Sequence, residues 1–512
     1  MSELIEFFGT NRAKLAEQTL EHIGITFMSL LLATALAVPA GILISRRRNL
    51  AASFLGVAGV LQTIPSIALL GFLLPLLGIG LKPAIFALFL YALLPILRNT
   101  YTGITGVDAS VTEAAMGMGM TPTQILRKVE LPLALSVIFA GLRTATVINV
   151  GVATLAAYIG AGGLGEFIFG GIALNNPTMI LAGAIPAALL AILFDQLLAW
   201  LQHLPHRRLT RASLLFSVGM LLLSFSIQLP TWFTSGIRAG FDTEFLGRSD
   251  GYPAIRERYD IRFNTVTLSS PLMYKAVREG YVDLIGGYAT DGRVKAFNLR
   301  VLEDDQNAFP PYYCAPLIRT QTAQQYPEVV EALNQLGGKL ADTTMTRLNY
   351  QVDYEKMSPD TVARRYLEKI GLWRPDRAQG GDRVVLASKI FTEQYILTAL
   401  FSQLINGYTD LDTERKNGLG GTKICFDALR TGEVDLYPEY TGTGLMVILQ
   451  STSSQLERDM TDPDWVYQRV QSAFRQKFSA EWLEPLGFNN TYALMAREED
   501  AERRGWRAIS DL

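Results

Sequence analysis

Histidine and cysteine are scarce in this sequence of 512 residues, which contains 3 His and 2 Cys. The three histidines, His22, His203 and His206, all precede the polar second half of the chain. That half therefore has no histidine for a Ser/His or Cys/His nucleophilic pair, or for a zinc site. We expect a protein that is not an enzyme, with no catalytic residue, no cofactor and no metal.

Dense basic segments are absent too. The 46 Lys and Arg residues nearly balance the 48 Asp and Glu residues, and no Lys/Arg block stands in the second half. A phosphate-tracking surface is therefore not expected, and nor is a nucleic-acid partner. The chain also lacks Gly-x-x-x-x-Gly-Lys-Ser/Thr, because in Gly418–Lys423 the lysine follows threonine. Any ATP hydrolysis must then come from another subunit.

Long apolar runs fill the first 232 residues. Each run is long enough to cross, or nearly cross, a hydrocarbon core of about 30 Å. We expect about six transmembrane helices, near residues 22–44, 52–78, 83–98, 135–158, 179–201 and 212–232. Residues 240–512 have the composition of a soluble domain.

The basic residues between these runs predict the orientation. Arg46, Arg47 and Arg48 follow the first run. Arg98 ends the third run, and Arg127 and Lys128 precede the fourth. Arg207, Arg208 and Arg211 lie between the fifth and the sixth. The positive-inside bias puts these loops in the cytoplasm and the N-terminus outside. We therefore expect a multi-pass protein of the cell (inner) membrane, with 240–512 on the external or periplasmic side.

A polar stretch, Glu113–Pro132, interrupts the apolar half on the cytoplasmic side. Its first residues favour a helix, while Thr121 and Pro122 suit the start of a second. Composition alone is more typical of an ordinary loop. The spacing, however, resembles the EAA loop of ABC-importer permeases, with Val129 where that pattern prefers Ile. The matching docking residues are Glu113, Ala114, Ala115, Gly119, Leu131 and Pro132. The resemblance implies a helix pair that docks on a separate ATP-binding cassette subunit, in a permease homodimer.

The second half resembles the substrate-binding proteins of quaternary-ammonium importers, which take up glycine betaine, choline, carnitine and proline betaine. The segments that carry the resemblance are "SKIFTEQYIL", "GLGGTKICFDALRTGEVDLYPEYTGTGL", "LGFNNTYAL", "EFLGRSDGYP", "GGYATDGR" and "LEDDQNAFPPYYCAP". In the first half, "QTIPSIALLGF" and "RTATVINVG" also resemble permeases of these systems. The implied fold is an all-α transmembrane permease followed by an α/β, two-lobed domain like the periplasmic binding proteins.

The order of these segments is unusual. In the family, the "SKIFTEQ" segment opens the domain and the "FPPYY" segment comes near its end, whereas here the order is reversed. We predict a circular permutation, with 240–305 and 489–512 sharing one lobe and 313–370 and 383–488 the other. The alternatives are a missing segment and two half-domains that belong to different copies. The predicted domains are the permease (1–211, with the EAA loop at 113–132), a sixth helix and tether (212–239), the late half (240–372), a linker (373–382) and the early half (383–512).

A trimethylammonium group donates no hydrogen bond, so a cage of aromatic ring faces suits it best. By motif match, the cage consists of Tyr440, Tyr492, Tyr288 and Tyr312, although Tyr313 is an alternative to its neighbour Tyr312. The resemblance implies that Lys389, Arg248 and Thr443 hold the carboxylate of a betaine. Ordinary packing is the commoner role of any single tyrosine, but four in matching motifs favour a cage.

The sequence as a whole predicts the membrane subunit of an ATP-driven importer for quaternary ammonium osmolytes. Its expected partners are the small-molecule ligand, the ATP-binding subunit, a second permease copy and the lipid bilayer. A membrane-tethered sensor and an importer of another small zwitterion, such as an amino acid, are the alternatives. Cys314 and Cys425 both lie on the external side, where a disulfide is permitted but not required.

Overall fold

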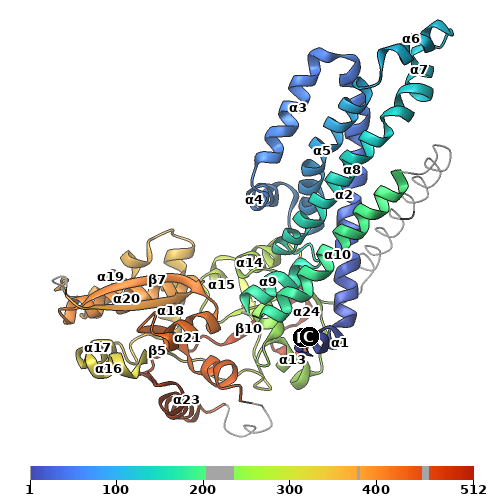
Figure 1. Cartoon of the computed structure of the whole chain (residues 1–512). Coiled ribbons are helices and arrows are strands. Elements are labelled where there is room, and N and C mark those ends of the chain that lie inside the picture. The colour runs from blue at the N-terminus through green and yellow to red at the C-terminus, as the bar shows by residue number, and fades with distance from the viewer. Residues whose placement is uncertain (1, 175, 203–218, 220–235, 378–380, 452–460) are drawn as a thin grey trace. The chain divides into compact units, whose positions relative to one another are not determined.

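The computed structural model describes all residues except 1, 175, 203–218, 220–235, 378–380 and 452–460 (Figure 1). The chain divides into two compact units, mainly residues 1–235 and mainly residues 236–512. The first is helical and the second is built on two β-sheets.

The helical unit is a bundle of long apolar helices. In it, α5 packs against α2 and α8, and α8 also packs against α10. The described elements are α1 (Ser2–Thr10), α2 (Arg12–Arg46), α3 (Arg48–Thr63), α4 (Ser66–Leu77), α5 (Leu81–Thr105), α6 (Ala109–Gly117), α7 (Pro122–Ile125), η1 (Leu126–Glu130), α8 (Leu131–Ala153), η2 (Thr154–Ile159), α9 (Gly165–Ala173) and α10 (Pro177–Gln202).

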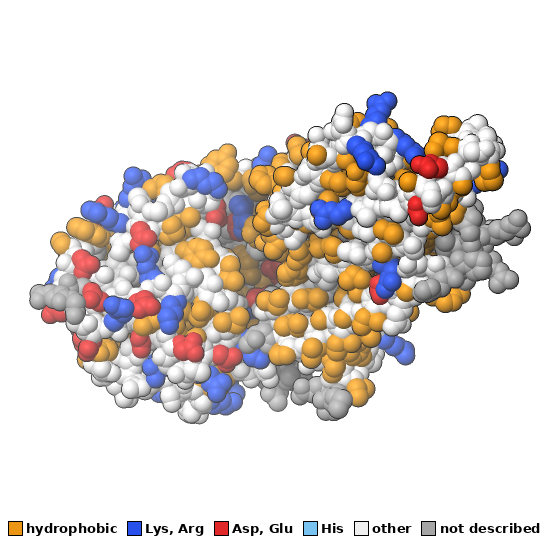
Figure 2. All heavy atoms as spheres, turned by 45° about the horizontal axis from the view of Figure 1, so that its top comes forward, with side chains coloured by type: hydrophobic (Ala, Val, Ile, Leu, Met, Phe, Trp, Pro, Cys, Tyr) orange, Lys and Arg blue, Asp and Glu red, His pale blue; other side chains and the backbone are white. Residues whose placement is uncertain are grey.

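Among the described residues, 4 helices are long and apolar enough to cross a membrane, or up to 5 if the bent pair α3–α4 counts as one span. Each of the first five predicted runs overlaps one of these elements. The predicted sixth, 212–232, lies outside the described residues. Apart from Val301, Tyr354 and Ile390, the described large hydrophobic side chains that are exposed all lie within residues 5–200. Figure 2 shows rows of such side chains, as expected for a surface that faces lipid.

The second predicted span is broken rather than straight. Helices α3 and α4 meet at 97° across Ile64 and Pro65. Proline disfavours helical geometry in the residue before it, and Ile64 is accordingly extended, with ψ 126°. The hydroxyl of Tyr91 donates a hydrogen bond to the Ile64 carbonyl, which the break leaves without a helical partner. The apolar composition of this run continues through the proline, so hydropathy alone predicts one straight helix here.

The polar stretch forms the expected helix–turn–helix. Helix α6 ends in a turn at Gly119, whose φ is +79°. Thr121 caps α7 through a capping box with Gln124, and Pro122 is at the first helical position. Both helices lie at one end of the helical unit (Figure 1).

Two charged residues of the bundle neutralise each other. Arg143 of α8 donates two hydrogen bonds to the Asp195 carboxylate of α10, each 2.8 Å long. Charged residues inside apolar helices can mark an ion path, but here each charge has its partner within the bundle, which favours a role in pairing the helices.

The second unit contains two five-stranded sheets, one in each lobe. The first has the order β2-β1-β3-β10-β4 and the second β7-β6-β8-β5-β9. Their strands are β1 (Arg238–Phe241), β2 (Asn264–Thr267), β3 (Leu284–Tyr288), β4 (Leu299–Val301), β5 (Cys314–Arg319), β6 (Arg383–Lys389), β7 (Asp412–Gly420), β8 (Leu436–Tyr440), β9 (Ala480–Trp482) and β10 (Tyr492–Arg497). The strands within 238–301 and 492–497 thus share one sheet and those within 314–319 and 383–482 share the other, which agrees with the predicted membership of the two lobes.

Helices cover both sheets and contribute to their cores. Those after β1 are α12 (Thr243–Gly247), α13 (Tyr252–Tyr259), α14 (Ser270–Arg278), α15 (Arg293–Ala296), α16 (Thr320–Gln325), α17 (Pro327–Asn334), α18 (Asp342–Asp353) and α19 (Pro359–Lys369). Those after β6 are α20 (Thr392–Tyr408), α21 (Thr422–Thr431), α22 (Thr441–Thr443), η3 (Gly444–Ile448), α23 (Pro463–Phe478), α24 (Glu498–Arg504) and η5 (Ile509–Asp511). The first residue of the predicted linker 373–382 is packed, because Trp373 is half-buried and the Arg364 guanidinium lies 4.6 Å from the centre of its ring. Residues 378–380 of this linker lie outside the described residues.

The two lobes repeat one topology. In each lobe two parallel strands are neighbours, β1 and β3 in one and β6 and β8 in the other. The second of each pair is flanked by an antiparallel strand from the other half of the chain, β10 beside β3 and β5 beside β8. The sequence shows the same repeat, in "GYVDLIGGYATDG" (280–292) and "GEVDLYPEYTGTG" (432–444). Asp283 and Asp435 each accept a hydrogen bond from a backbone N–H of the first strand of their lobe. Tyr288 and Tyr440 consequently end equivalent strands, β3 and β8.

The chain crosses between the lobes in two segments, 302–313 and 483–491. The segments run side by side, with an antiparallel bridge between Tyr313 and Asn489 and a hydrogen bond from the Asn490 N–H to the Tyr312 carbonyl. Paired segments of this kind form a two-stranded connection at which lobes can open and close.

Candidate functional site

A small cavity is lined by side chains from both lobes and from the segments between them. It brings together all seven residues that the sequence predicted as ligand-binding: Tyr440, Tyr492, Tyr288, Tyr312, Lys389, Arg248 and Thr443. Glu244, Phe391, Thr422 and Asn490 also line it. Tyr312 lines the cavity, and its neighbour Tyr313 is not among the lining residues.

Aromatic rings form most of the wall. Phe391 stacks on Tyr288 of the other lobe, with ring centroids 5.8 Å apart and planes 8° from parallel. The ring of Tyr440 also stacks on that of Phe391, with centroids 6.3 Å apart. Tyr492 stacks on Tyr288 at 5.3 Å, and Tyr312 meets Tyr492 edge-on at 5.6 Å. Four of the five rings were predicted, and together they offer the electron-rich faces that attract an organic cation.

Arg248 lines the cavity and forms hydrogen bonds with residues of both lobes. It donates two hydrogen bonds to Asp250, at 2.8 and 2.6 Å, and one to the hydroxyl of Thr443 in the other lobe, at 3.4 Å. Its guanidinium lies 5.2 Å from the centre of the Tyr492 ring. Burial lowers the pKa of Arg248, but Asp250, Tyr492 and Tyr312 together outweigh burial and hold the pKa above its ordinary value. The arginine is therefore cationic and fixed in place.

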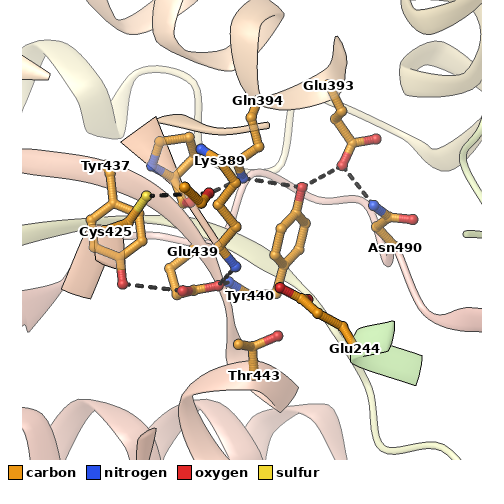
Figure 3. A network of polar contacts seen from close by, with 12 residues as sticks. Glu244, Lys389, Glu393, Gln394, Cys425, Tyr437, Glu439, Tyr440, Thr443 and Asn490 are labelled. Atoms are coloured by element: carbon orange, nitrogen blue, oxygen red, sulfur yellow. Dashed lines mark hydrogen bonds and ion pairs between the residues drawn. The ribbon is translucent and has the colours of Figure 1, made fainter. Parts of the chain in front are cut away.

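Lys389 is also paired, which the sequence did not reveal. Its ammonium donates to the Glu439 carboxylate at 2.5 Å, and both side chains are buried. Tyr437 donates to the other oxygen of Glu439 at 3.1 Å (Figure 3). Lys389 lies 5.2 Å from the Tyr440 ring centre, and its ammonium has donors left for a ligand.

Carboxylates outnumber cations around this cavity. Glu244 lines it, 4.0 Å from Arg248, and Glu393 accepts a hydrogen bond from Tyr440 at 2.6 Å. With Asp250 and Glu439, four carboxylates surround two cations. An excess of negative charge favours a ligand with a positive group.

Three cavity-lining residues that were not predicted, Phe391, Asn490 and Glu244, are close in sequence to residues that were. Phe391 comes two residues after Lys389, and Asn490 two residues before Tyr492. In extended chain, residues two apart face the same side, so this spacing was the available signal. Glu244 precedes Arg248 by four, which places both on one face of a helical turn.

The predicted docking residues lie at the α6–α7 end of the helical unit. Glu113, Ala114 and Gly119 are exposed, whereas Ala115 is buried. An added Cβ at Gly119 would meet no atom within 4 Å. Leu131 and Pro132, both half-buried, begin α8. The two cysteines, Cys314 and Cys425, are free and buried.

Comparison with protein families agrees with this architecture. Residues 233–369 and 382–512 match the substrate binding domain of ABC-type glycine betaine transport systems. Residues 33–211 match the inner membrane component of binding-protein-dependent transport systems. The chain therefore belongs to the family of ABC-type glycine betaine transport components, and it joins a permease and a substrate-binding domain in one polypeptide. The predicted fold class is confirmed.

Individual proteins similar to the permease half have related names. The choline transport system permease protein OpuBB of Bacillus subtilis is 47% identical over 214 residues, which cover 42% of this chain and 97% of that protein. The carnitine transport permease protein OpuCB of Listeria monocytogenes is 49% identical over 203 residues, 40% of this chain and 93% of its own. The osmoprotectant import permease protein OsmW of Salmonella typhimurium is 47% identical over 205 residues, 39% of this chain and 95% of its own.

Proposed function

We propose that this chain captures and imports quaternary ammonium compounds, such as glycine betaine, choline or their relatives. The convergence of five aromatic rings on one cavity is the observation that carries the proposal. The carboxylates of Asp250, Glu439 and Glu393, which contact residues of the lining, add negative charge around it. A trimethylammonium group would lie against the rings, since it attracts ring faces and needs no hydrogen-bond acceptor. The names of the permease relatives support the same ligand class.

A betaine carboxylate would take the donors that remain on Arg248 and Lys389, together with the hydroxyl of Thr443. Each of these cations already has a carboxylate partner. A ligand carboxylate would therefore share donors with Asp250 and Glu439, so that geometry decides its affinity more than net attraction. Choline, which has no carboxylate, would depend on the rings and the surrounding negative charge.

Transport would proceed by alternating access. Ligand binding closes the lobes about the paired crossing segments, and the closed domain delivers its ligand to the permease. The helix pair α6–α7 docks on a separate ATP-binding subunit, and two permease copies form the pathway. The binding domain lies on the external side, as the basic residues of the loops predict.

The test is uptake of labelled choline and glycine betaine by vesicles that contain the full chain, with and without a co-expressed ATP-binding subunit. Uptake that requires both the subunit and ATP is expected. Ligand binding without uptake in the complete system would contradict transport and favour a tethered sensor.

We also propose that the binding domain is circularly permuted. The repeated topology of the lobes supports it, because either half can come first without changing the strand order of either sheet. Leu512 and Phe241 should then lie on the order of 20 Å apart or less, a gap that a few residues can span. A rearranged chain in which 383–512 precedes 240–372 should bind ligand as the natural order does. Failure of that chain to fold would contradict the permutation.

A further inference from the structure

Glu393, in the first turn of α20, is the most completely hydrogen-bonded carboxylate near the cavity. One of its oxygens accepts from the Tyr440 hydroxyl at 2.6 Å and from the Asn490 amide at 2.8 Å (Figure 3). The other accepts from the Thr290 hydroxyl at 2.6 Å and the Asn349 amide at 2.9 Å. Thr290 follows β3 of one lobe, and Asn490 lies in the crossing segment 483–491. Tyr440 and Asn349 belong to the other lobe. The carboxylate therefore joins the lobes directly behind the cage.

All four donors to Glu393 are neutral. Among the described residues, no Lys or Arg forms an ion pair with it, whereas Glu439 is paired with Lys389 and Asp250 with Arg248. Glu393 is 3% exposed. Burial raises its pKa above the ordinary value, and the hydrogen bonds from Thr290 and Tyr440 oppose that rise. A buried carboxylate without a cation is costly, so its presence beside a binding cavity calls for a function.

The link to the cage passes through Tyr440. A phenol that donates a short hydrogen bond to a carboxylate is polarised, and its ring becomes richer in electrons. Tyr440 lines the cavity. Its hydroxyl points toward Glu393 (Figure 3). The same bond fixes the orientation of the ring. Glu393 would thus act on a cation that it does not touch.

We propose that Glu393 is the counter-charge for the quaternary ammonium group, acting as a positioning residue through Tyr440. The proposal rests on the proposed function and deepens it by naming the group that selects a charged ligand over an uncharged one of equal shape. Cation–π and Coulomb attraction both fall when the carboxylate is removed, whereas shape complementarity and apolar contact do not.

The test compares choline with its uncharged tert-butyl analogue, in which carbon replaces nitrogen. Both ligands are titrated against the full chain in lipid nanodiscs, unaltered and with Glu393→Gln. The glutamine keeps the size of the side chain and removes the charge. We expect choline to bind roughly tenfold or more weakly to the variant, while the analogue binds as before.

Thr290→Val is the matched control, because it removes one donor to Glu393 and keeps the charge. It should leave the ratio of the two dissociation constants unchanged. If Glu393→Gln does not fold, Tyr440→Phe cuts the link while retaining both the ring and the carboxylate. It should weaken choline more than the analogue.

Two outcomes separate this inference from the function on which it rests. Equal weakening of both ligands in Glu393→Gln, or in Tyr440→Phe, would show a structural role only and overturn the counter-charge. No binding of choline, glycine betaine or the analogue by the unaltered chain would overturn the proposed function and this inference with it.

Discussion

Replacing the two tyrosines that end equivalent strands separates the contribution of a ring face from that of a hydroxyl. Tyr288 stacks on Phe391 and Tyr492, and its hydroxyl makes no hydrogen bond within the described part of the chain. The Tyr440 hydroxyl donates to Glu393 at 2.6 Å and accepts from Gln394 at 3.3 Å. The same substitution therefore has different consequences at the two positions.

Tyr288→Phe keeps the ring face, so the dissociation constant for choline should change less than about twofold. Tyr440→Phe also keeps the ring but removes a hydrogen bond to a carboxylate, which contributes about 1.5–3 kcal/mol. Half of that free energy, about 0.75–1.5 kcal/mol, corresponds to a loss of roughly four- to twelvefold in affinity. Replacing either tyrosine with alanine removes a cation–π contribution of about 0.5–2 kcal/mol together with packing, and should cost roughly tenfold or more.

The assay is isothermal titration calorimetry on the full chain in nanodiscs, with choline and glycine betaine. Unchanged dissociation constants in both alanine variants would refute the aromatic cage and leave these tyrosines as packing residues. If Tyr288→Phe costs as much as Tyr288→Ala, the hydroxyl rather than the ring face contacts the ligand.

Three further predictions address the carboxylate clamp, the pH dependence of stability and coupling. Arg248→Gln combined with Asp250→Asn removes the buried pair without leaving a lone charge, and should weaken glycine betaine more than choline in the same titrations; equal loss would exclude a carboxylate clamp. Burial raises the pKa of Asp242 to about 7 from an ordinary value of about 3.9, so the folded state binds this proton more tightly than the unfolded state. Its contribution to stability is therefore greatest below about pH 4 and declines up to about pH 7, by at most about 4 kcal/mol. Asp242 caps α12, since its carboxylate accepts a hydrogen bond from the Phe245 N–H at 2.7 Å, and Asp242→Asn keeps that cap. In thermal unfolding this variant should exceed the unaltered chain in stability above about pH 7 and lose that advantage near pH 4; parallel pH profiles would contradict this. Gly119→Trp should abolish uptake while ligand affinity is kept, since Gly119 is exposed and has a φ of +79°; uptake at the normal rate would exclude a docking role for this turn.

Apolar run length and ordered motifs made much of the architecture predictable. Five of the six expected runs overlap described helices, and the lobe membership follows from motif order. The break at Pro65 was not predicted, because a hydropathy count does not distinguish a straight helix from a bent one. The proline itself was the local signal, since it disfavours helical geometry at Ile64.

The cavity was predictable residue by residue only where a motif matched. The tyrosines, Arg248 and Lys389 were found in this way, but their partners were not. The pairs Lys389–Glu439 and Arg248–Asp250, and the donors around Glu393, depend on tertiary geometry. Asn349 and Glu393, for example, are 44 residues apart in the chain. No local pattern reports such a contact, which is why the charge balance of the site became visible only in three dimensions.

Equilibrium binding by the unaltered full chain tests the central claim most directly. The panel consists of glycine betaine, choline, carnitine and proline betaine, with glutamine as a polar amino acid of similar size. We predict that at least one quaternary amine binds and that glutamine does not, because the α-ammonium and amide groups of glutamine must keep their hydrogen bonds and the ring faces do not replace the water that accepts them. Binding of glutamine with no binding of any quaternary amine would contradict the account.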